Sequence, residues 1–310
     1  MVLSTPRGSI AESGDHLRPT GCARSRLRDG VELRSGQRSD TILVVSALDS
    51  GTEQILVDVD GGIAIVTFNR PGKRNALSRE MREALPGVLE SLQGDTRVRA
   101  VVVTGAGGRA FMSGADISEL AEVGAALAPP PSDASSRVVI DPWASFEKPV
   151  LAMIQGYCLG AGLLIALAAD IRIASEDSQF GIPAARLGAG YPFGGVDRLV
   201  SVVGPAHAAD ILFSGRRLRA DEALRMGLVN RLVPADDLRS VTLEQARAIA
   251  DNAPLSVAAA KYAISRTRPG ADPSDDGRMD RMVGACFASD DFKEGTAAFG
   301  EKRPPRFTGR

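Results

Sequence analysis

The amino-acid sequence predicts an α/β fold, in which a layered core of strands and helices is followed by a helical C-terminal region. The stretches "VRAVVVTG", "KPVLAMIQG" and "DIRIAS" are typical of strands buried inside a sheet, and helical patterns separate them. The last 70 or so residues show only helical patterns, and no sequence repeat is evident. With 310 residues, 44% of them hydrophobic, the chain can form one large domain or two smaller ones.

The first 50 residues differ in composition from the rest of the chain. They are polar, rich in Ser, Arg and Gly, and without helical periodicity. An organellar presequence would be poor in acids, so Glu12, Asp15, Asp29 and Glu32 argue against one. We therefore predict that residues 1–50 are a disordered extension and that the folded part begins near Ile55.

Charge and rare residue types argue against several classes of function. A net charge of −1 gives no general attraction to nucleic acid or to an acidic membrane surface. No apolar run reaches the roughly 18 residues of a membrane span. Cys22, Cys158 and Cys286 lack the spacing of a metal site, which favours free thiols in a reducing compartment. We expect a cytoplasmic protein with no nucleic-acid partner and no membrane span.

Local patterns predict the remaining elements. The run "ILVDVDGGIAIVTF" indicates two strands joined by a hairpin at Gly61 and Gly62. Ser78 is placed to cap a helix, and Pro86 predicts a kink or a break within it. The apolar stripe of that helix consists of Met81, Leu85, Val88, Leu89 and Leu92. Further helices are expected from about Asp116, over 136–146 after a break at 129–131, near 196–203, 206–213 and 220–226, and over 241–252, 255–265 and 277–288, with a short strand at "LVNRLV".

Three familiar kinds of site fit the sequence poorly. "GAGGRA" follows a strand as a dinucleotide-binding turn would, but the chain continues as a loop through Gly114 instead of opening a helix. A Ser-His-Asp hydrolase needs a suitable histidine and a G-x-S-x-G elbow, and only His16 and His207 are present. Two histidines are also too few for a histidine-based metal site, so we expect no metal.

Two glycine-containing turns remain as candidates for a site. "FMSGADISEL" and "GYCLGAGLLIALAAD" each follow a predicted buried strand and precede a helix. If the two strands are neighbours, both turns meet at one edge of a sheet. Two backbone N–H groups could then bind one oxygen, which is how an enolate or a tetrahedral oxyanion is stabilised.

These segments resemble the crotonase superfamily, the enoyl-CoA hydratase/isomerase family. The stretch "LAMIQGYCLGAGLLIALAADI" is similar to the family signature, and the resemblance continues through "FNRPGKRNAL", "FMSGADI", "LFSGRRLRADEALRMGLVNRLVP", "NAPLSVAAAK" and "EGTAAFGEKRPPRF". It spans about Ile55–Phe307. It implies a crotonase (ClpP-like) spiral of ββα units over residues 51–250 and a helical oligomerisation region over 251–310. Homotrimers or hexamers are expected.

The resemblance also implies an acyl-CoA or enoyl-CoA thioester as ligand, with no cofactor beyond the coenzyme A of the substrate. The thioester oxygen would lie between the backbone N–H groups of Ala115 and Ala161. The acyl-CoA would be lined by Asn75, Ala76, Leu77, Ala115, Asp116 and Ile117. Lys261, Lys302, Arg303 and Arg306 are candidate phosphate partners or, equally, solvated surface charges. Asp116 and Asp170 are expected to be structural.

The sequence departs from the family at both positions where a hydratase has a catalytic glutamate. Leu164 stands two residues beyond the small triplet Gly160–Gly162, and Ala184 stands in "FGIPAARLG" where relatives have "FGxPE". Neither side chain can transfer a proton. Tyr191 is a candidate substitute donor or an aromatic wall of the acyl pocket, and Arg186 and Asp197 lie in the same loop.

These observations leave three functions open. The first is an enoyl-CoA hydratase/isomerase-family enzyme of fatty-acid or related acyl-CoA metabolism, in which standard hydratase activity is doubtful. The second is a non-catalytic acyl-CoA binder or carrier. A structural subunit of a catalytic relative is a weaker third reading, because both glycine turns are kept.

Overall fold

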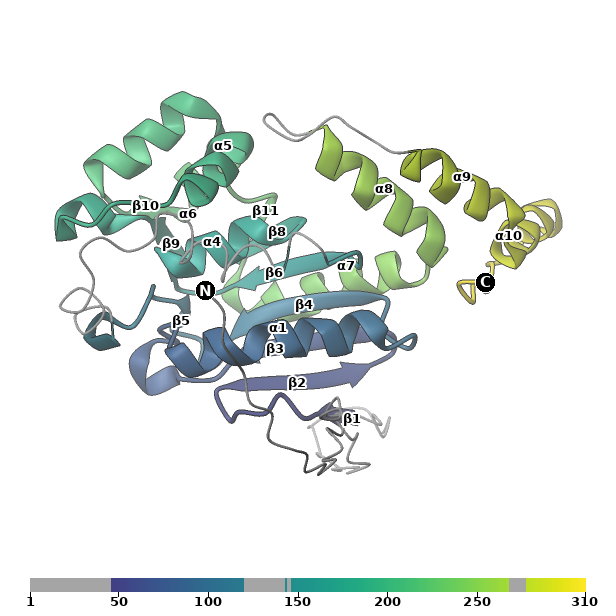
Figure 1. Ribbon diagram of the computed structural model, residues 1–310, viewed down its shortest axis with the longest axis horizontal. Helices are drawn as coiled ribbons and strands as arrows, with labels where there is room; N and C mark the ends of the chain where they lie inside the picture. Colours follow the sequence, from purple (N-terminus) through teal and green to yellow (C-terminus); the bar gives the residue numbers. More distant parts are fainter. Residues whose placement is uncertain (1–45, 120–142, 144–145, 268–276) are drawn as a thin grey trace, which may run out of the picture.

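Two β-sheets surrounded by helices form the body of the protein in a computed structural model, which describes residues 46–119, 143, 146–267 and 277–310 (Figure 1). The larger sheet has seven strands in the order β1-β2-β3-β4-β6-β8-β11. Its strands are β1 (Ser46–Leu48), β2 (Ile55–Asp60), β3 (Ile63–Phe68), β4 (Ala100–Gly105), β6 (Val150–Ile154), β8 (Ile171–Ser175) and β11 (Arg231–Val233). β1, β2 and β3 pair antiparallel, and the strands from β3 to β11 pair parallel. The three predicted buried strands are thus confirmed as β4, β6 and β8.

A second, smaller sheet was not expected as such. It has the order β10-β9-β7-β5, with β5 at Ala110–Met112, β7 at Tyr157–Leu159, β9 at Gln179–Gly181 and β10 at Leu218–Arg219. β5, β7 and β9 pair parallel. None of its strands exceeds three residues, which is too short to show an alternating pattern, so the sequence indicates only glycine-rich turns there.

The two sheets are joined by a repeated ββα connection. β4 leads to β5 and a helical turn at 117–119, β6 leads to β7 and helix α4 (Ala161–Ala168), and β8 leads to β9 and the 3₁₀ helix η2 (Pro183–Leu187). In each unit the first strand joins the large sheet and the second joins the small one. The chain therefore advances as a spiral, as the resemblance implies.

Helix α1 (Arg79–Gly94) lies against one face of the large sheet. Its predicted cap is confirmed, because the Ser78 hydroxyl accepts a hydrogen bond from the Met81 N–H at 3.2 Å. The helix is not broken at Pro86, since α1 continues across that position. Pro86 is exposed, so water can solvate the carbonyl that it leaves without a donor, and the buried stripe around Leu85 and Leu89 holds the helix on the sheet.

The remaining helices lie on both sides of the large sheet and extend beyond it. They are α5 (Phe193–Ser214), α6 (Ala220–Arg225), α7 (Leu238–Ala250), α8 (Pro254–Arg266), α9 (Arg278–Ala288) and α10 (Asp290–Glu301), with short 3₁₀ helices η1 (Pro71–Lys73) and η3 (Ala235–Asp237). α5 leaves helical geometry at Gly204, which accounts for the two helices expected there. α7 packs beneath the sheet, and α8, α9 and α10 project from the body as an arm (Figure 1).

The folded part begins earlier than expected. β1 lies inside the predicted extension of 1–50 and pairs with β2, Leu48 lying opposite Val57. The start near Ile55 is therefore too late, because three residues suffice for an edge strand once a partner is present. The helix predicted over 136–146 and the break at 129–131 lie outside the described residues, apart from Trp143 and Phe146. In the described ranges, no helix has the length and apolarity needed to cross a membrane.

Candidate active site

The two glycine turns meet at one edge of the small sheet. Gly114 follows β5 and Gly160 follows β7, which are parallel neighbours. A Cβ atom added to Gly160 would lie only 3.6 Å from the Gly114 Cα, so the two backbones are in near contact. Both glycines have positive φ, +119° and +50°, a conformation that side chains with a Cβ rarely adopt. The predicted convergence of the turns is thus confirmed.

The amide groups that follow these glycines are available to a ligand. The Leu77 N–H donates a hydrogen bond to the Gly114 carbonyl at 2.8 Å, and the Leu77 carbonyl accepts one from the Asp116 N–H at 3.0 Å. Leu77 therefore forms hydrogen bonds with the residues on either side of Ala115 and none with Ala115 itself. Ala161 is the first residue of α4, whose first N–H groups have no intrahelical acceptor. Within the described part of the chain, neither the Ala115 nor the Ala161 N–H has a hydrogen-bond acceptor. The helix dipole adds partial positive charge at Ala161.

The segment at 75–77 supports the first turn from the inside. Asn75 is fully buried, and its amide donates to the carbonyls of Ala106 at 3.0 Å and Ala110 at 2.7 Å. Its side-chain oxygen accepts the Arg70 N–H at 2.9 Å. All polar atoms of its side chain are therefore hydrogen-bonded within the protein, and the Asn75 side chain holds the loop in position. Ala76 and Leu77 are also buried, whereas Ile117 is 65% exposed.

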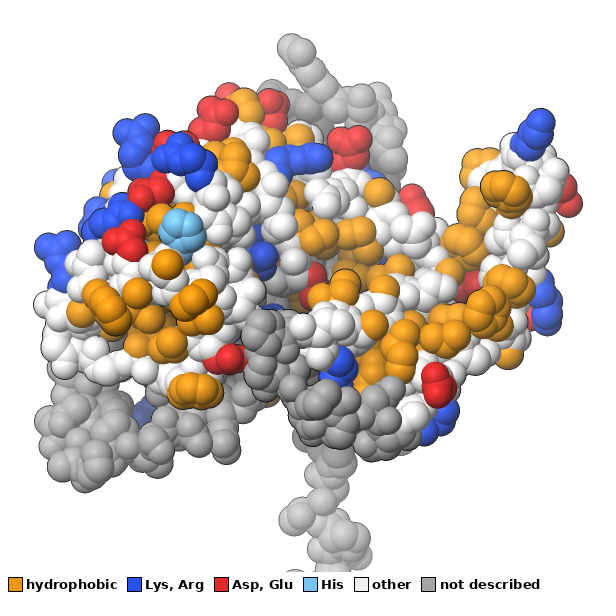
Figure 2. Space-filling model, turned by 90° about the horizontal axis from the view of Figure 1, so that it is seen from above, with side chains coloured by type: hydrophobic (Ala, Val, Ile, Leu, Met, Phe, Trp, Pro, Cys, Tyr) orange, Lys and Arg blue, Asp and Glu red, His pale blue; other side chains and the backbone are white. Residues whose placement is uncertain are grey.

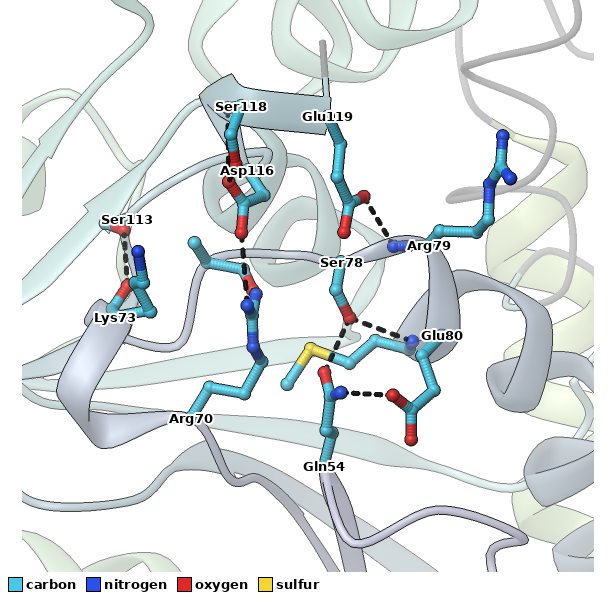
Figure 3. Close-up of polar contacts among 12 residues, drawn as sticks. Gln54, Arg70, Lys73, Ser78, Arg79, Glu80, Ser113, Asp116, Ser118 and Glu119 are labelled. Atoms are coloured by element: carbon cyan, nitrogen blue, oxygen red, sulfur yellow. Dashed lines mark hydrogen bonds and ion pairs between the residues drawn. The ribbon is translucent and has the colours of Figure 1, made fainter. Parts of the chain in front are cut away.

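Asp116 links the turn at Gly114 to the segment that begins at Arg70 (Figure 3). Its carboxylate accepts hydrogen bonds from the Ser118 hydroxyl at 2.6 Å and N–H at 3.2 Å, and it forms an ion pair with Arg70 at 3.1 Å. The Ser118 hydrogen bond, followed by the Arg70 guanidinium, holds the pKa of Asp116 below its ordinary value of 3.8. Arg70 also donates to the Ala76 carbonyl at 2.7 Å. The structural role expected for Asp116 is consistent with these contacts, and Arg70 is a positioning residue that the sequence reading did not single out.

The first turn of α4 is surrounded by apolar groups and one phenol. Leu164 is only 5% exposed. The Tyr191 hydroxyl donates a hydrogen bond to the Gly160 carbonyl at 3.3 Å. A Cβ atom on Gly195 would lie 2.9 Å from Leu164 Cδ2 and 3.0 Å from Tyr191 Cε1, so only glycine allows α5 to approach this closely. Burial raises the pKa of Tyr191 and that of the nearby Cys158 thiol, so both groups stay protonated.

Ala184 lies in η2, the 3₁₀ helix that follows β9. The end of β9 is linked to the start of α4 by the Gly160 N–H, which donates to the Gly181 carbonyl at 2.9 Å. Ala184 follows three residues later and packs against the core. The other loop candidates are directed elsewhere: the aliphatic part of Arg186 lies against Gly215, and Asp197 is two residues from Gly195, on the opposite side of α5.

The basic residues expected to bind phosphate are not brought to the two turns within this chain. The Lys261 ammonium lies beyond the far end of α4, where it pairs with Asp170 at 2.9 Å and donates to the Lys148 carbonyl at 2.7 Å. Asp170 also accepts the Val150 N–H at 2.8 Å, consistent with a structural role. Arg303 pairs with Glu294 in the arm at 2.6 Å. Among the described residues, no three His, Cys, Asp or Glu side chains gather to hold a metal ion.

Comparison with known proteins adds independent evidence to this geometry. Residues 58–310 match the family model described as enoyl-CoA hydratase/isomerase. The chain belongs to the enoyl-CoA hydratase/isomerase family. It is 37% identical over 249 residues to a short-chain-enoyl-CoA hydratase from Clostridium acetobutylicum, covering 80% of this chain and 95% of the relative.

Other members of the enoyl-CoA hydratase/isomerase family are similar over the same range. A 2,3-dehydroadipyl-CoA hydratase from Escherichia coli is 34% identical over 260 residues, covering 83% of this chain and 99% of the relative. The crystal structure of an enoyl-CoA hydratase/carnithine racemase from Magnetospirillum magneticum superposes with a TM-score of 0.77 at 33% identity, covering 84% of this chain and 97% of that one. The predicted crotonase fold is confirmed by this similarity.

Proposed function

We propose that this protein binds an acyl-CoA thioester, with the thioester oxygen held between the N–H groups of Ala115 and Ala161. The observation that supports this most directly is the near contact of Gly114 and Gly160, each followed by an amide without a protein acceptor. Preorganised N–H donors of this kind stabilise negative charge on a thioester oxygen as it develops. The relatives from Clostridium acetobutylicum and Escherichia coli are named as hydratases of CoA thioesters, which supports the same ligand class for this chain.

The coenzyme A part would lie along the exposed side of the Ala76–Leu77 and Ala115–Ile117 segments. Ile117 offers an exposed apolar side chain there, and Asp116 and Asn75 would act by holding the backbone in place. Lys261 is not included in the proposed site of this chain, because its ammonium is already paired with Asp170.

Standard hydration is not the reaction that these surroundings favour. General acid–base groups each contribute about 10²–10⁴-fold to such a reaction, and one oxyanion donor about 10²–10³-fold. Leu164 and Ala184 cannot act as general acid or base, so only the contribution of the oxyanion donors remains. A protein that binds and polarises an acyl-CoA thioester with altered chemistry fits best, and a non-catalytic acyl-CoA binder is the second candidate.

The arm of α8, α9 and α10 would support a homotrimer or hexamer. Hydrophobic side chains are exposed along the surface of this arm (Figure 2). Phe299, in α10, is 88% exposed. Fatty-acid or related acyl-CoA metabolism in the cytoplasm, without a separate cofactor, completes the proposal.

Calorimetry with butyryl-CoA and crotonyl-CoA, alongside loss of the enoyl absorbance, tests this function. Gly160→Ala is expected to weaken binding about tenfold or more, because the substituted residue disfavours φ of +50°. Gly51→Ala is the matched control, since Gly51 also has positive φ but no atom within 4 Å of an added Cβ. If neither CoA ester binds the wild-type protein, or if both variants bind equally well, the proposed site is wrong.

A further inference from the structure

Helix α4 begins with Ala161 and has no polar side chain of its own with which to hold its position. Its sequence is "AGLLIALA", and every residue from Gly162 to Ala168 is buried. A helix of eight residues is about 12 Å long, and its last carbonyls have no donor within the helix. Contacts from other elements must therefore hold both ends of α4.

Arg198, in the second turn of α5, holds the C-terminal end of α4. Its Nε donates a hydrogen bond to the Leu167 carbonyl at 2.8 Å, and its Nη2 donates one to the Ala168 carbonyl at 3.1 Å. Both residues are buried, so water has little access to these carbonyls if the guanidinium is removed. The positive charge of Arg198 also offsets the negative end of the helix dipole.

The contact at Arg198 is the last of three by which one segment follows α4 along its length. The Tyr191 hydroxyl contacts the carbonyl of the residue that precedes the helix. Gly195 lies against the first turn, where an added Cβ would be only 2.9 Å from Leu164 Cδ2. Gly195 and Arg198 are three residues apart in α5 and share one face of it. The same face of α5 therefore contacts both ends of α4.

Two different contacts restrain α4 in two directions. A Cβ atom on Gly162 would lie 2.4 Å from the Met112 carbonyl oxygen, so α4 packs directly on strand β5. This contact fixes the distance between α4 and the small sheet. The carbonyls of a helix point along its axis, so the hydrogen bonds from Arg198 act along that axis. An axial shift of α4 would break them.

We propose that Arg198 is a positioning residue that fixes the axial position of α4, and thereby the distance from the Ala161 N–H to the bound thioester oxygen. The inference rests on the proposed acyl-CoA site and deepens it by naming a residue outside the two turns on which its geometry depends. An oxyanion donor is effective when it lies about 2.7–3.1 Å from the oxygen. Arg198 acts from the opposite end of α4, about 12 Å from that donor.

Arg198→Met tests this role in the full chain with butyryl-CoA labelled with ¹³C at the thioester carbonyl. At saturation the wild type should move the carbonyl resonance downfield, because the amides polarise the bond. In Arg198→Met this shift should be smaller, and calorimetric affinity should fall about threefold or more. Arg198→Lys keeps the charge but not the forked donor, so its shift should lie between the two. A full wild-type shift in both variants would overturn the proposal.

Arg99→Met is the matched control. Arg99 is also half-buried and donates to two carbonyls, those of Ala250 at 3.2 Å and Phe307 at 2.6 Å, neither of which belongs to α4. Its loss should lower the melting temperature as Arg198→Met does, yet leave the ¹³C shift unchanged. An equal loss of shift in both methionine variants would mean general loosening of the fold and would overturn the role of Arg198.

Two further outcomes are decisive. If Arg198→Met does not fold, Arg198→Lys decides, and a full wild-type shift in that variant would overturn the proposal. Failure of the wild type to bind butyryl-CoA would instead contradict the acyl-CoA site on which the proposal rests.

Discussion

The hydroxyl of Tyr191 donates a hydrogen bond to the carbonyl of Gly160, 3.3 Å away, and so links the loop before α5 to the residue that precedes Ala161. This carbonyl also accepts the Leu164 N–H at 3.1 Å as the first bond of α4. Tyr191 therefore contacts the helix start from which the proposed oxyanion donor arises. The contact suits a residue that positions the turn and forms a wall beside it.

Replacing Tyr191 by Phe should weaken the fold slightly without abolishing ligand binding. Loss of one neutral hydrogen bond is expected to lower the free energy of unfolding by about 1 kcal/mol. Acyl-CoA affinity should fall by less than about tenfold, because the Ala161 amide itself remains. Denaturant unfolding and calorimetry measure the two quantities. If turnover of any acyl-CoA is abolished while binding persists, the phenol would instead be a proton donor.

The ionisation of Tyr191 gives a prediction in alkaline solution. Burial raises the pKa of this phenol above its ordinary value of 10.0. Above about pH 10 the unfolded chain loses this proton while the folded protein keeps it, so stability should fall as the pH rises. Below that pH the contribution is constant. Tyr191→Phe should show a shallower alkaline loss of stability than the wild type. Identical pH profiles would contradict the burial of this group.

Glutamates introduced at positions 164 and 184 should enable hydration of an enoyl-CoA. Leu164→Glu combined with Ala184→Glu should raise the hydration of crotonyl-CoA by about 10² or more, because each general acid or base contributes about 10²–10⁴-fold when correctly placed. The enoyl absorbance measures the rate. Leu164→Gln with Ala184→Gln is the control of equal size and should show no such gain. No gain in a folded double-glutamate variant that binds crotonyl-CoA would mean that these positions do not face the substrate.

The sequence predicts those parts of the molecule that depend on long apolar runs or on parallel neighbours. β4 and β6 are recognisable because both faces are covered, and the meeting of Gly114 with Gly160 follows from two adjacent strand ends. The small sheet is not predicted from the sequence, because its strands are too short to show an alternating pattern of apolar and polar residues. The burial of Asn75 is equally invisible, since its partners Ala106 and Ala110 lie more than 30 residues away.

Removing the side chain of Asn75 should destabilise the protein and disturb the first turn. Asn75→Ala leaves the carbonyls of Ala106 and Ala110 without donors and places alanine at a φ of +55°. We expect the free energy of unfolding to fall by about 2–4 kcal/mol. Asn75→Gly loses the same hydrogen bonds, but glycine tolerates this φ. Its free energy of unfolding should therefore fall by about 1 kcal/mol less than that of Asn75→Ala. Equal losses would show that backbone strain contributes nothing here.

We predict that the protein self-associates through exposed aromatic side chains of the α8–α10 arm. The rings of Phe287 and Phe292 contact edge to face, with centroids 5.1 Å apart, and Phe299 extends the same helical arm at 88% exposure. Aromatic side chains of this kind contribute much of the apolar area that oligomers bury. Light scattering should give three or six copies for the wild type and a monomer for the double variant Phe287→Glu, Phe299→Glu. Phe213→Glu is the matched control, since this residue is 81% exposed at the end of α5, outside the arm, and should leave the assembly intact. A wild-type monomer would contradict the prediction, and dissociation by Phe213→Glu alone would place the interface on α5.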